Sequence, residues 1–269
     1  MKSRRYSLLL LTMLLILTGC REQTIIKAPA AFHFIKAPID RQPITIPIDW
    51  ISVDIFEEIV EEIESDQSEK LDEKIVYLTF DDGPSKQTEQ ILQILAQYDA
   101  QATFFYLVPN MIEFPEKVRE AAVNHAIGHH GVSHNKEVIY RSSTSVVEEM
   151  TKGQDYLYEL TGISSNLIRA PFGSSPYMVP EYKQAVKDEG FILWDWTIDS
   201  RDWQYRDERY IGEVITQYEK LSSDKPVVIL LHEHIETVEH LPTLLNYFAQ
   251  KGYTFRSLDE SLPAYVNPY

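Results

Sequence analysis

From Lys74 onward, strand-like segments alternate with segments of helical periodicity, and this alternation restricts the fold more than any other feature. The strand candidates are short runs rich in β-branched and aromatic residues: Ile75–Phe80, Ala102–Val108, Ala126–His129, Asn166–Arg169, Phe191–Thr197, Val227–Leu231 and Tyr253–Leu258. Between them, apolar residues recur at helical spacing, as in Ile91, Leu92, Leu95 and Tyr98. Strands that alternate with helices pair in parallel. We therefore predict an α/β fold, a distorted (β/α) barrel of about seven parallel strands, and 269 residues suffice for one.

In such a barrel, functional side chains should follow the carboxyl ends of the strands. Polar residues stand there after five of the strand candidates: Asp81 and Asp82, His130 and His134, Arg169, Asp199 and Asp202, and His232. Read alone, the hexapeptide Thr79–Pro84, which holds both Asp81 and Asp82, is also compatible with a solvated turn. Packing does not explain polar residues at five successive strand ends, so together they favour a functional site.

His130 and His134 are four residues apart, which places both imidazoles on one side of a helical turn. Imidazole suits zinc and similar cations, and a carboxylate completes a three-ligand site that keeps an open position for water. Two histidines at this spacing are common on protein surfaces, so the Asp81–Asp82 pair at a neighbouring strand end carries the argument. His129 lies five residues from His134, a poorer geometry for one face.

The first residues resemble an export signal. Three cations within the first five residues precede an apolar run, Leu8–Leu17, which is too short to span a bilayer comfortably. The run ends in Leu17-Thr18-Gly19-Cys20, which resembles the lipobox of bacterial lipoproteins. The resemblance implies a signal peptide over residues 1–19, a lipid on Cys20 and an extracytoplasmic protein anchored to the cell membrane. The alternative is an uncleaved anchor with an incidental cysteine.

Composition also indicates how the rest of the chain is organised and which partners it can bind. Cys20 is the only cysteine, so internal disulfides are excluded. We interpret residues 20–73 as a tether that contains prolines and an acidic run; an accessory module around Ile44–Phe56 is the competing interpretation. Residues 74–262 form the expected catalytic domain, and residues 263–269 a C-terminal tail. The net charge of −16 excludes nucleic acid as a partner and predicts substrate contacts that are local and largely neutral. We expect the protein to be a monomer.

Taken in order, the five polar segments resemble the five motifs of the polysaccharide deacetylases, carbohydrate esterase family four, with the nodulation-type deacetylase homology domain. The matching segments are Thr79–Pro84, His130–His134, Arg169–Gly173, Asp199–Trp203 and Leu230–His232. The resemblance covers Lys74 to about Leu262. One departure is Gly131, where the family usually has a Ser or Thr whose hydroxyl braces the loop, so we expect a looser metal site. Glu233 replaces a frequent Asp, and we expect little effect from that change.

The resemblance implies that Asp82, His130 and His134 hold a divalent metal. Zn²⁺ is the foremost candidate, with Co²⁺, Ni²⁺ or Mn²⁺ as alternatives. Its open position would polarise the acetyl carbonyl and acidify a water. Asp81 is implied as the general base that takes the proton of this water, and Arg169 as its ion-pair partner.

The same resemblance implies that His232 is the general acid that protonates the leaving amine, with Asp199 orienting its ring. The backbone N–H of Phe172 would donate to the oxyanion. Trp203 and Leu230 would form the wall of the pocket for the acetyl methyl group. Ordinary packing at the barrel rim is compatible with both of these last residues.

The implied function is that of a metal-dependent hydrolase that removes N-acetyl groups from N-acetylated amino sugars of a cell-surface glycan, foremost peptidoglycan. An O-acetyl esterase on a polysaccharide and a catalytically inactive glycan-binding lipoprotein are the alternatives. The intact Asp81, His232 and ligand set argue against the inactive protein. A phosphoryl hydrolase would need further carboxylates and cations, and only Arg169 and Arg201 are near.

Overall fold

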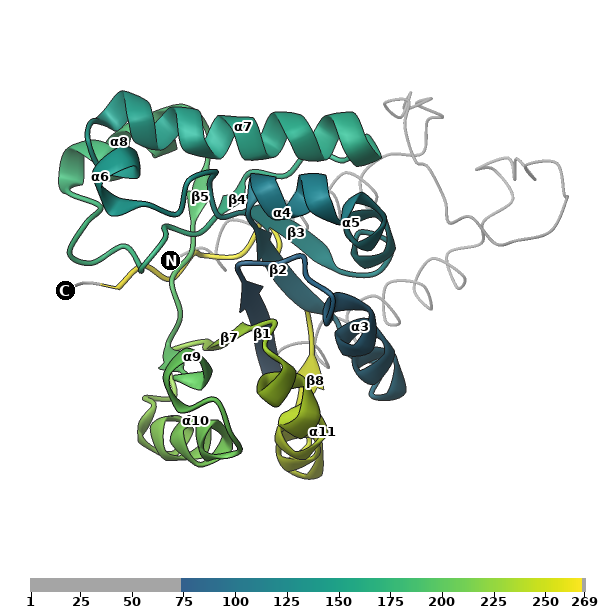
Figure 1. Ribbon diagram of the computed structural model, residues 1–269. Coiled ribbons are helices and arrows are strands. Elements are labelled where there is room, and N and C mark those ends of the chain that lie inside the picture. Colours follow the sequence, from purple (N-terminus) through teal and green to yellow (C-terminus); the bar gives the residue numbers. More distant parts are fainter. Residues whose placement is uncertain (1–73, 268–269) are drawn as a thin grey trace, which may run out of the picture. The chain divides into compact units, whose positions relative to one another are not determined.

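The structure, a computed structural model, describes residues 74–267 (Figure 1). The predicted signal peptide, Cys20 and the predicted tether lie outside the described residues. Elements follow in the order β1 (Ile75–Asp81), α3 (Thr88–Gln97), β2 (Ala102–Tyr106), α4 (Val108–Glu113), α5 (Pro115–Ala121), β3 (Ala126–His129), α6 (Lys136–Ile139), α7 (Ser143–Thr161), β4 (Leu167–Ile168), α8 (Pro180–Asp188), β5 (Ile192–Leu193), β6 (Ile198–Asp199), α9 (Asp202–Tyr205), α10 (Arg209–Lys220), β7 (Val227–His232), α11 (Ile235–Gln250) and β8 (Thr254–Phe255). No helix within this part of the chain has the length and apolarity needed to cross a membrane.

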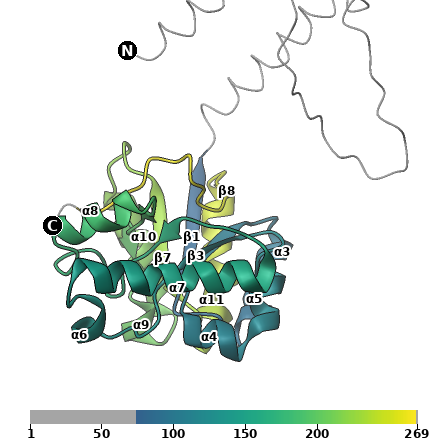
Figure 2. The same ribbon diagram turned by 90° about the horizontal axis from the view of Figure 1, so that it is seen from above.

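The strands form one parallel sheet in the order β5-β4-β3-β2-β1-β7-β6, with β8 beside the first residues of β1. The sheet curls into a half-barrel, and among the described strands no pairing joins β5 to β6. The predicted α/β barrel of parallel strands is therefore confirmed. Helices cover its outer side, and α7 lies against β3 and beside α8 (Figure 2).

One predicted strand, Phe191–Thr197, is divided in the structure. Residues 192–193 pair with β4 as β5, after which the chain leaves that edge and pairs with β7 only from Thr197 onward. The reason is a side chain: the carbonyl oxygens of Trp194 and Asp195 accept hydrogen bonds from Arg169 and not from a neighbouring strand. The interruption thus serves to hold an arginine inside the barrel.

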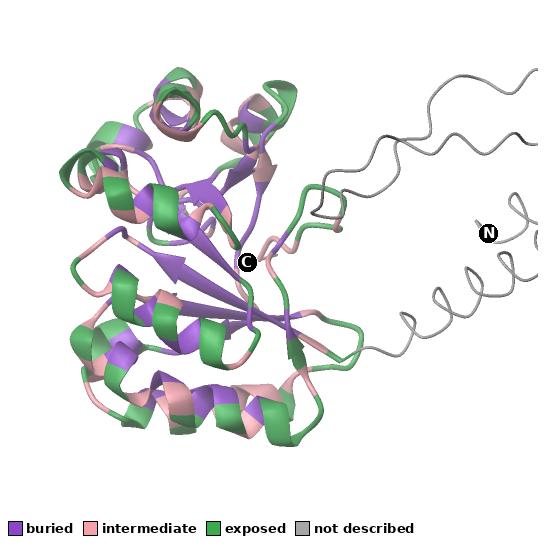
Figure 3. Ribbon diagram, turned by 90° about the vertical axis from the view of Figure 1, so that its right-hand side faces the viewer, coloured by how far each residue is buried: buried purple, intermediate pink, exposed green. Residues whose placement is uncertain are grey.

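The two faces of β1 have different surroundings. Val76, Leu78 and Phe80 pack outward in the large core between the sheet and helices α3, α10 and α11. Successive side chains of a strand point to opposite faces, so Tyr77, Thr79 and Asp81 point inward. The strands are buried while the helices keep exposed outer faces (Figure 3). Each large apolar side chain buried in this way contributes about 1.5–3 kcal/mol.

The barrel interior changes character along β1. Next to Tyr77 lies an apolar cluster with Phe105, Trp194, Val228 and Leu258. Thr79 follows and contacts Arg169, and Asp81 stands last, at the carboxyl end. The interior therefore has an apolar base, a polar middle layer and an acidic end.

The residues that we assigned to a C-terminal tail pack on the barrel as far as Asn267. Tyr265 lies against the apolar cluster of the interior, and its carbonyl oxygen accepts a hydrogen bond from the Asp195 N–H. The Asn267 N–H in turn donates to Asp195 Oδ2 at 2.7 Å. Residues 263–267 are thus part of the folded body.

Candidate metal and catalytic site

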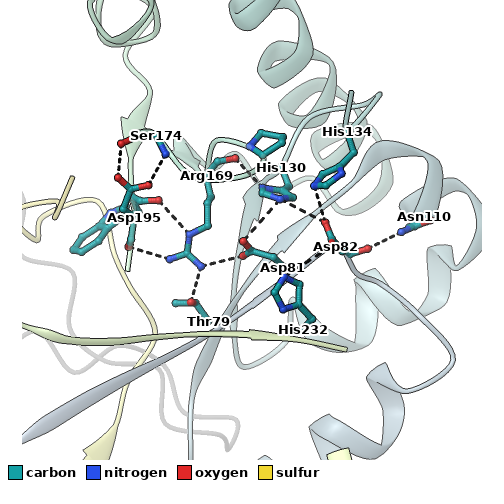
Figure 4. A network of polar contacts seen from close by, with 12 residues as sticks. Thr79, Asp81, Asp82, Asn110, His130, His134, Arg169, Ser174, Asp195 and His232 are labelled. Atoms are coloured by element: carbon teal, nitrogen blue, oxygen red, sulfur yellow. Dashed lines mark hydrogen bonds and ion pairs between the residues drawn. The ribbon is translucent and has the colours of Figure 1, made fainter. Parts of the chain in front are cut away.

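The polar residues singled out from the sequence gather at the carboxyl ends of the parallel strands. Asp81 is the last residue of β1 and lies opposite His232, the last residue of β7. His130 follows β3 directly. Figure 4 shows these side chains with Asp82, His134 and Arg169 around one small volume. The structure thus brings together six of the predicted site residues.

Asp82, His130 and His134 form a group suited to a metal ion. Asp82 Oδ1 lies 3.5 Å from His130 Nε2 and 3.4 Å from His134 Nε2, and the three ligand atoms lie within 4.8 Å of one another. Asp82 Oδ1 is buried and accepts no hydrogen bond from any described residue. A buried carboxylate oxygen without a donor needs another partner, and a divalent cation between it and two imidazoles fits.

Both histidines direct Nε2 toward Asp82. His130 Nδ1 lies 2.8 Å from the carbonyl oxygen of Arg169, so Nδ1 carries a proton and donates it to this oxygen, which leaves Nε2 to face Asp82. Burial lowers the pKa of His134, although the charge of Asp82 opposes this effect. The lowered pKa favours the neutral ring, the form in which an imidazole binds a metal.

Asp81 and Arg169 form a buried ion pair beside this group. Arg169 Nη1 lies 3.0 Å from Asp81 Oδ1 and donates to Thr79 Oγ1 at 2.6 Å. Its Nε and Nη2 donate to the carbonyl oxygens of Trp194 and Asp195. Asp81 Oδ2 faces the metal group, 3.8 Å from His130 Nε2. Arg169 is thus fixed by four acceptors and holds one Asp81 oxygen while the other faces the site.

His232 lies on the other side of the site and is paired with Asp202. Its Nδ1 is 2.8 Å from Asp202 Oδ1, while Asp202 Oδ2 accepts from the His232 N–H and from Thr237 Oγ1, each at 2.7 Å. Burial by itself lowers the pKa of His232, but the hydrogen bond and charge of Asp202, with the charges of Asp81 and Asp82, raise it to about 9. The ring is protonated at neutral pH, and its Nε2 lies 4.0 Å from Asp82 Oδ2.

The predicted contact between Asp199 and His232 is wrong, because Asp202 occupies that place. Asp199 ends β6, and its Oδ1 accepts from the N–H of Arg201 at 2.9 Å. Arg201 is left-handed, with φ of 54°, and this turn carries the next residue, Asp202, beneath His232. The sequence contained the signal, since Asp202 follows the same strand, but we assigned it no role.

The three residues predicted to contact substrate differ in their exposure. The Phe172 ring is 43% exposed and 4.4 Å from the His134 ring, and the Phe172 N–H donates to no residue within 74–267. Trp203, in α9, is 50% exposed. Leu230 is buried two residues before His232, so both side chains project from one face of β7.

Several of these residues have uncommon backbone conformations. Asp82, His134 and Phe172 have φ values of 68°, 44° and 67°, in the left-handed region. This conformation costs a non-glycine residue about 1–2 kcal/mol and persists only where the surroundings impose it. At Asp82 the carbonyl oxygen is held by Asn110 Nδ2 at 2.6 Å.

Sequence reasoning missed Glu149, which holds the loop between the two histidines. This buried residue of α7 accepts with Oε2 from the N–H groups of Val132 and Ser133, at 2.6 and 2.9 Å. Gly131 has φ of +90°, and a Cβ there would lie 3.1 Å from Glu149 Oε2. The loop thus has a brace in place of the absent hydroxyl. The available signal was that Glu149 falls three residues after Val146, on the buried stripe of the helix.

Glu233 has a similar role for the loop after Asp82. Its buried Oε2 accepts from Ser85 Oγ at 2.7 Å and from Thr88 Oγ1 at 2.5 Å, and burial raises the pKa of Glu233. A Cβ on Gly83 would lie 2.3 Å from Glu233 Oε1, so a larger residue at this position would have to displace the Glu233 side chain.

Known proteins are similar to this chain in sequence and in fold. The family model described as polysaccharide deacetylase matches residues 68–191. A peptidoglycan-N-acetylglucosamine deacetylase of Bacillus cereus is 39% identical over 199 residues, 72% of each chain. The crystal structure of the Bacillus cereus polysaccharide deacetylase Bc1974 matches with a TM-score of 0.66 and 35% identity, over 72% of this chain and 97% of that one. The catalytic domain of a peptidoglycan N-acetylglucosamine deacetylase from Eubacterium rectale matches with a TM-score of 0.66 and 28% identity, over 72% and 92%.

Proposed function

Because this chain belongs to the polysaccharide deacetylase family and is a deacetylase, we propose that it removes N-acetyl groups from the amino sugars of peptidoglycan with a divalent metal. The names of its relatives support the substrate, since two of them are peptidoglycan N-acetylglucosamine deacetylases. One observation carries the proposal: the buried Asp82 Oδ1, which has no hydrogen-bond donor among the described residues, faces His130 and His134. Asp81 and His232 flank this group and supply a base and an acid.

The metal would be held by Asp82 Oδ1, His130 Nε2 and His134 Nε2. This set of one carboxylate and two imidazoles suits Zn²⁺, which we propose as the ion. When bound, the ion supplies Lewis-acid polarisation of the acetyl carbonyl and lowers the pKa of a water to about 7.

Asp81 would take the proton of the attacking water with Oδ2, the oxygen that faces the metal group. Arg169 holds the other oxygen at 3.0 Å, so the carboxylate cannot rotate away. The proton would move to Asp81 as the water oxygen bonds to the acetyl carbon. The carbonyl oxygen, now negative, would accept a hydrogen bond from the Phe172 N–H.

His232 would then give the proton on Nε2 to the amine nitrogen as the bond between carbon and nitrogen breaks. Its raised pKa keeps this proton in place at neutral pH. Asp202 is the positioning residue, because it binds the Nδ1 proton and so directs Nε2 into the site. We propose that Leu230 and Trp203 form the wall around the acetyl methyl group.

We further propose that the protein acts outside the cytoplasm, held at the cell membrane by a lipid on Cys20. The support is the cationic start, the apolar run Leu8–Leu17 and the lipobox-like Leu17-Thr18-Gly19-Cys20. A lipid-anchored enzyme would stay close to the wall glycan.

The test is acetate release by the zinc-loaded protein from N-acetylglucosamine oligomers, peptidoglycan glycan strands and acetylated xylan, with new amines counted by mass spectrometry. On the first two substrates we expect one free amine for each acetate released. With the His232→Ala variant we expect neither acetate nor new amines. Faster release from xylan without new amines would instead establish the O-acetyl esterase. Binding to glycan without acetate release from any substrate would establish the inactive protein.

A further inference from the structure

A lysine at the start of α6 lies over two aromatic rings at the edge of the site. Lys136 Nζ is 4.5 Å from the ring centroid of Phe172 and 4.5 Å from that of Tyr177. It also donates to Tyr177 Oη at 2.5 Å. Tyr177 stacks on Tyr140, with ring centroids 5.3 Å apart. We call Lys136, Phe172 and Tyr177 the cationic ledge.

The ledge is next to the metal group. The Phe172 ring that lies under Lys136 Nζ also contacts the ring of His134, 4.4 Å away between centroids. Only one aromatic ring therefore separates the ammonium group from a proposed metal ligand. With an acetyl group beside Asp82, His130 and His134, the ledge would lie beside the sugar that carries this group or beside the next sugar of the strand.

The Lys136 ammonium has donors available for a ligand. Lysine has three N–H donors, and Tyr177 Oη takes one of them. Within residues 74–267, no carboxylate forms an ion pair with Lys136, whereas Lys117 pairs with both Glu89 and Glu120. The residue is exposed, and the two rings hold its charge in place. A fixed, exposed cation in a chain of net charge −16 gives an anion a local place to bind.

We infer that the cationic ledge is a subsite for a carboxylate carried by the glycan beside the sugar that loses its acetyl group. This inference rests on the proposed function. The exposed face of Phe172 would pack on the apolar face of a sugar ring, and the ammonium group would bind the carboxylate. In peptidoglycan, such a carboxylate is the lactyl group of muramic acid where no peptide is attached, or an acidic group of the attached peptide.

The experiment compares kcat/KM on three substrates of equal length: a neutral N-acetylglucosamine oligomer, a peptide-free glycan with free lactyl carboxylates, and a peptide-bearing glycan. Lys136→Met removes the charge but keeps an unbranched apolar side chain, and Lys136→Arg keeps the charge. Lys225→Met is the matched control, since Lys225 also lies over an aromatic ring, that of Tyr265, but two residues before β7 begins and so at the opposite end of the barrel.

We expect Lys136→Met to lower kcat/KM on a carboxylate-bearing glycan, relative to the neutral oligomer, by about 3- to 10-fold, mainly through KM. Lys136→Arg and Lys225→Met should keep the wild-type ratio, and high salt should weaken the wild-type preference. Loss on the peptide-free glycan assigns the lactyl group, and loss on the peptide-bearing glycan alone assigns the peptide. An equal effect on all three substrates, or none, overturns the inference. Wild-type protein inactive on every substrate would refute the proposed function instead.

Discussion

Replacing Asp202 with Asn should lower the pKa of His232 by at least about 2 units. In the wild type the hydrogen bond and charge of Asp202 are the largest of the effects that raise this pKa to about 9. His129 shows what burial does without a carboxylate, because burial lowers its pKa to about 4 even though a backbone carbonyl binds its ring. Without the Asp202 charge, the pKa of His232 should therefore fall to its ordinary value of about 6.5 or lower. A fall of 2 units corresponds to about 3 kcal/mol.

The sign of the effect on activity and stability follows from the raised pKa. A general acid must be protonated, so wild-type kcat should fall only above about pH 9 and the variant's kcat already above about pH 6.5. At pH 8 the protonated fraction would drop about 30-fold. The raised pKa also stabilises the folded wild type fully below about pH 6.5, and this stability is lost as the pH rises through about 9. Asp202→Asn should lack this pH-dependent stability.

Two measurements check this prediction. NMR titration of the His232 ring in metal-free protein gives its pKa, and the pH dependence of kcat in the zinc-loaded enzyme gives the alkaline limit. Asp199→Asn is the control, because Asp199 is the last residue of β6 and has no hydrogen bond to His232. In this variant the pKa of His232 should shift clearly less. A variant Asp202→Asn with an unchanged His232 pKa, or a larger shift in Asp199→Asn, would refute the pairing deduced from the structure.

Other perturbations separate the remaining roles. His134→Ala should lose its bound metal on dialysis, as measured by elemental analysis, while Asp81→Asn should keep the metal and lose at least about 10²-fold in turnover; metal loss in Asp81→Asn would mean that the two aspartates exchange roles. Glu149→Gln should weaken zinc affinity about 10-fold in chelator competition, because the charge that holds the N–H groups of the histidine loop is gone, and unchanged affinity would contradict the brace. The Cys20→Ala protein should no longer sediment with membranes, and it should keep full activity on soluble oligomers. A processed Cys20→Ala protein that still sediments with membranes would disprove the lipid anchor.

The sequence predicted the residues whose position follows from strand direction. Asp81, Arg169 and His232 could be placed together because parallel strands all present their carboxyl ends at one face. The choice between Asp199 and Asp202 could not be made this way, because it depends on the left-handed turn at Arg201. Such a turn has no sequence signal when the residue is not glycine.

Contacts between residues far apart in the sequence also could not be predicted from it. Glu149 reads as an acidic residue of an amphipathic helix, and its contact with a loop 16 residues earlier appears only when the helix is packed. The interruption between β5 and β6 has the same origin, because the Trp194 and Asp195 carbonyls bind a side chain from another strand end. In both cases a buried charge dictates the local backbone, whereas periodicity reports only apolar burial.

The direction of β1 puts the site and the first described residue at opposite ends of the barrel. The described chain enters the barrel through Lys74 and runs along β1, in which Asp81 is the seventh and last residue. At about 3.3 Å per residue, this separates the point of entry from the metal group by about 20 Å, along the full height of the barrel. The site therefore opens at the end of the barrel opposite the end at which the described chain begins. A surface coupled to the barrel at the Lys74 end should therefore leave the site accessible to a long glycan strand.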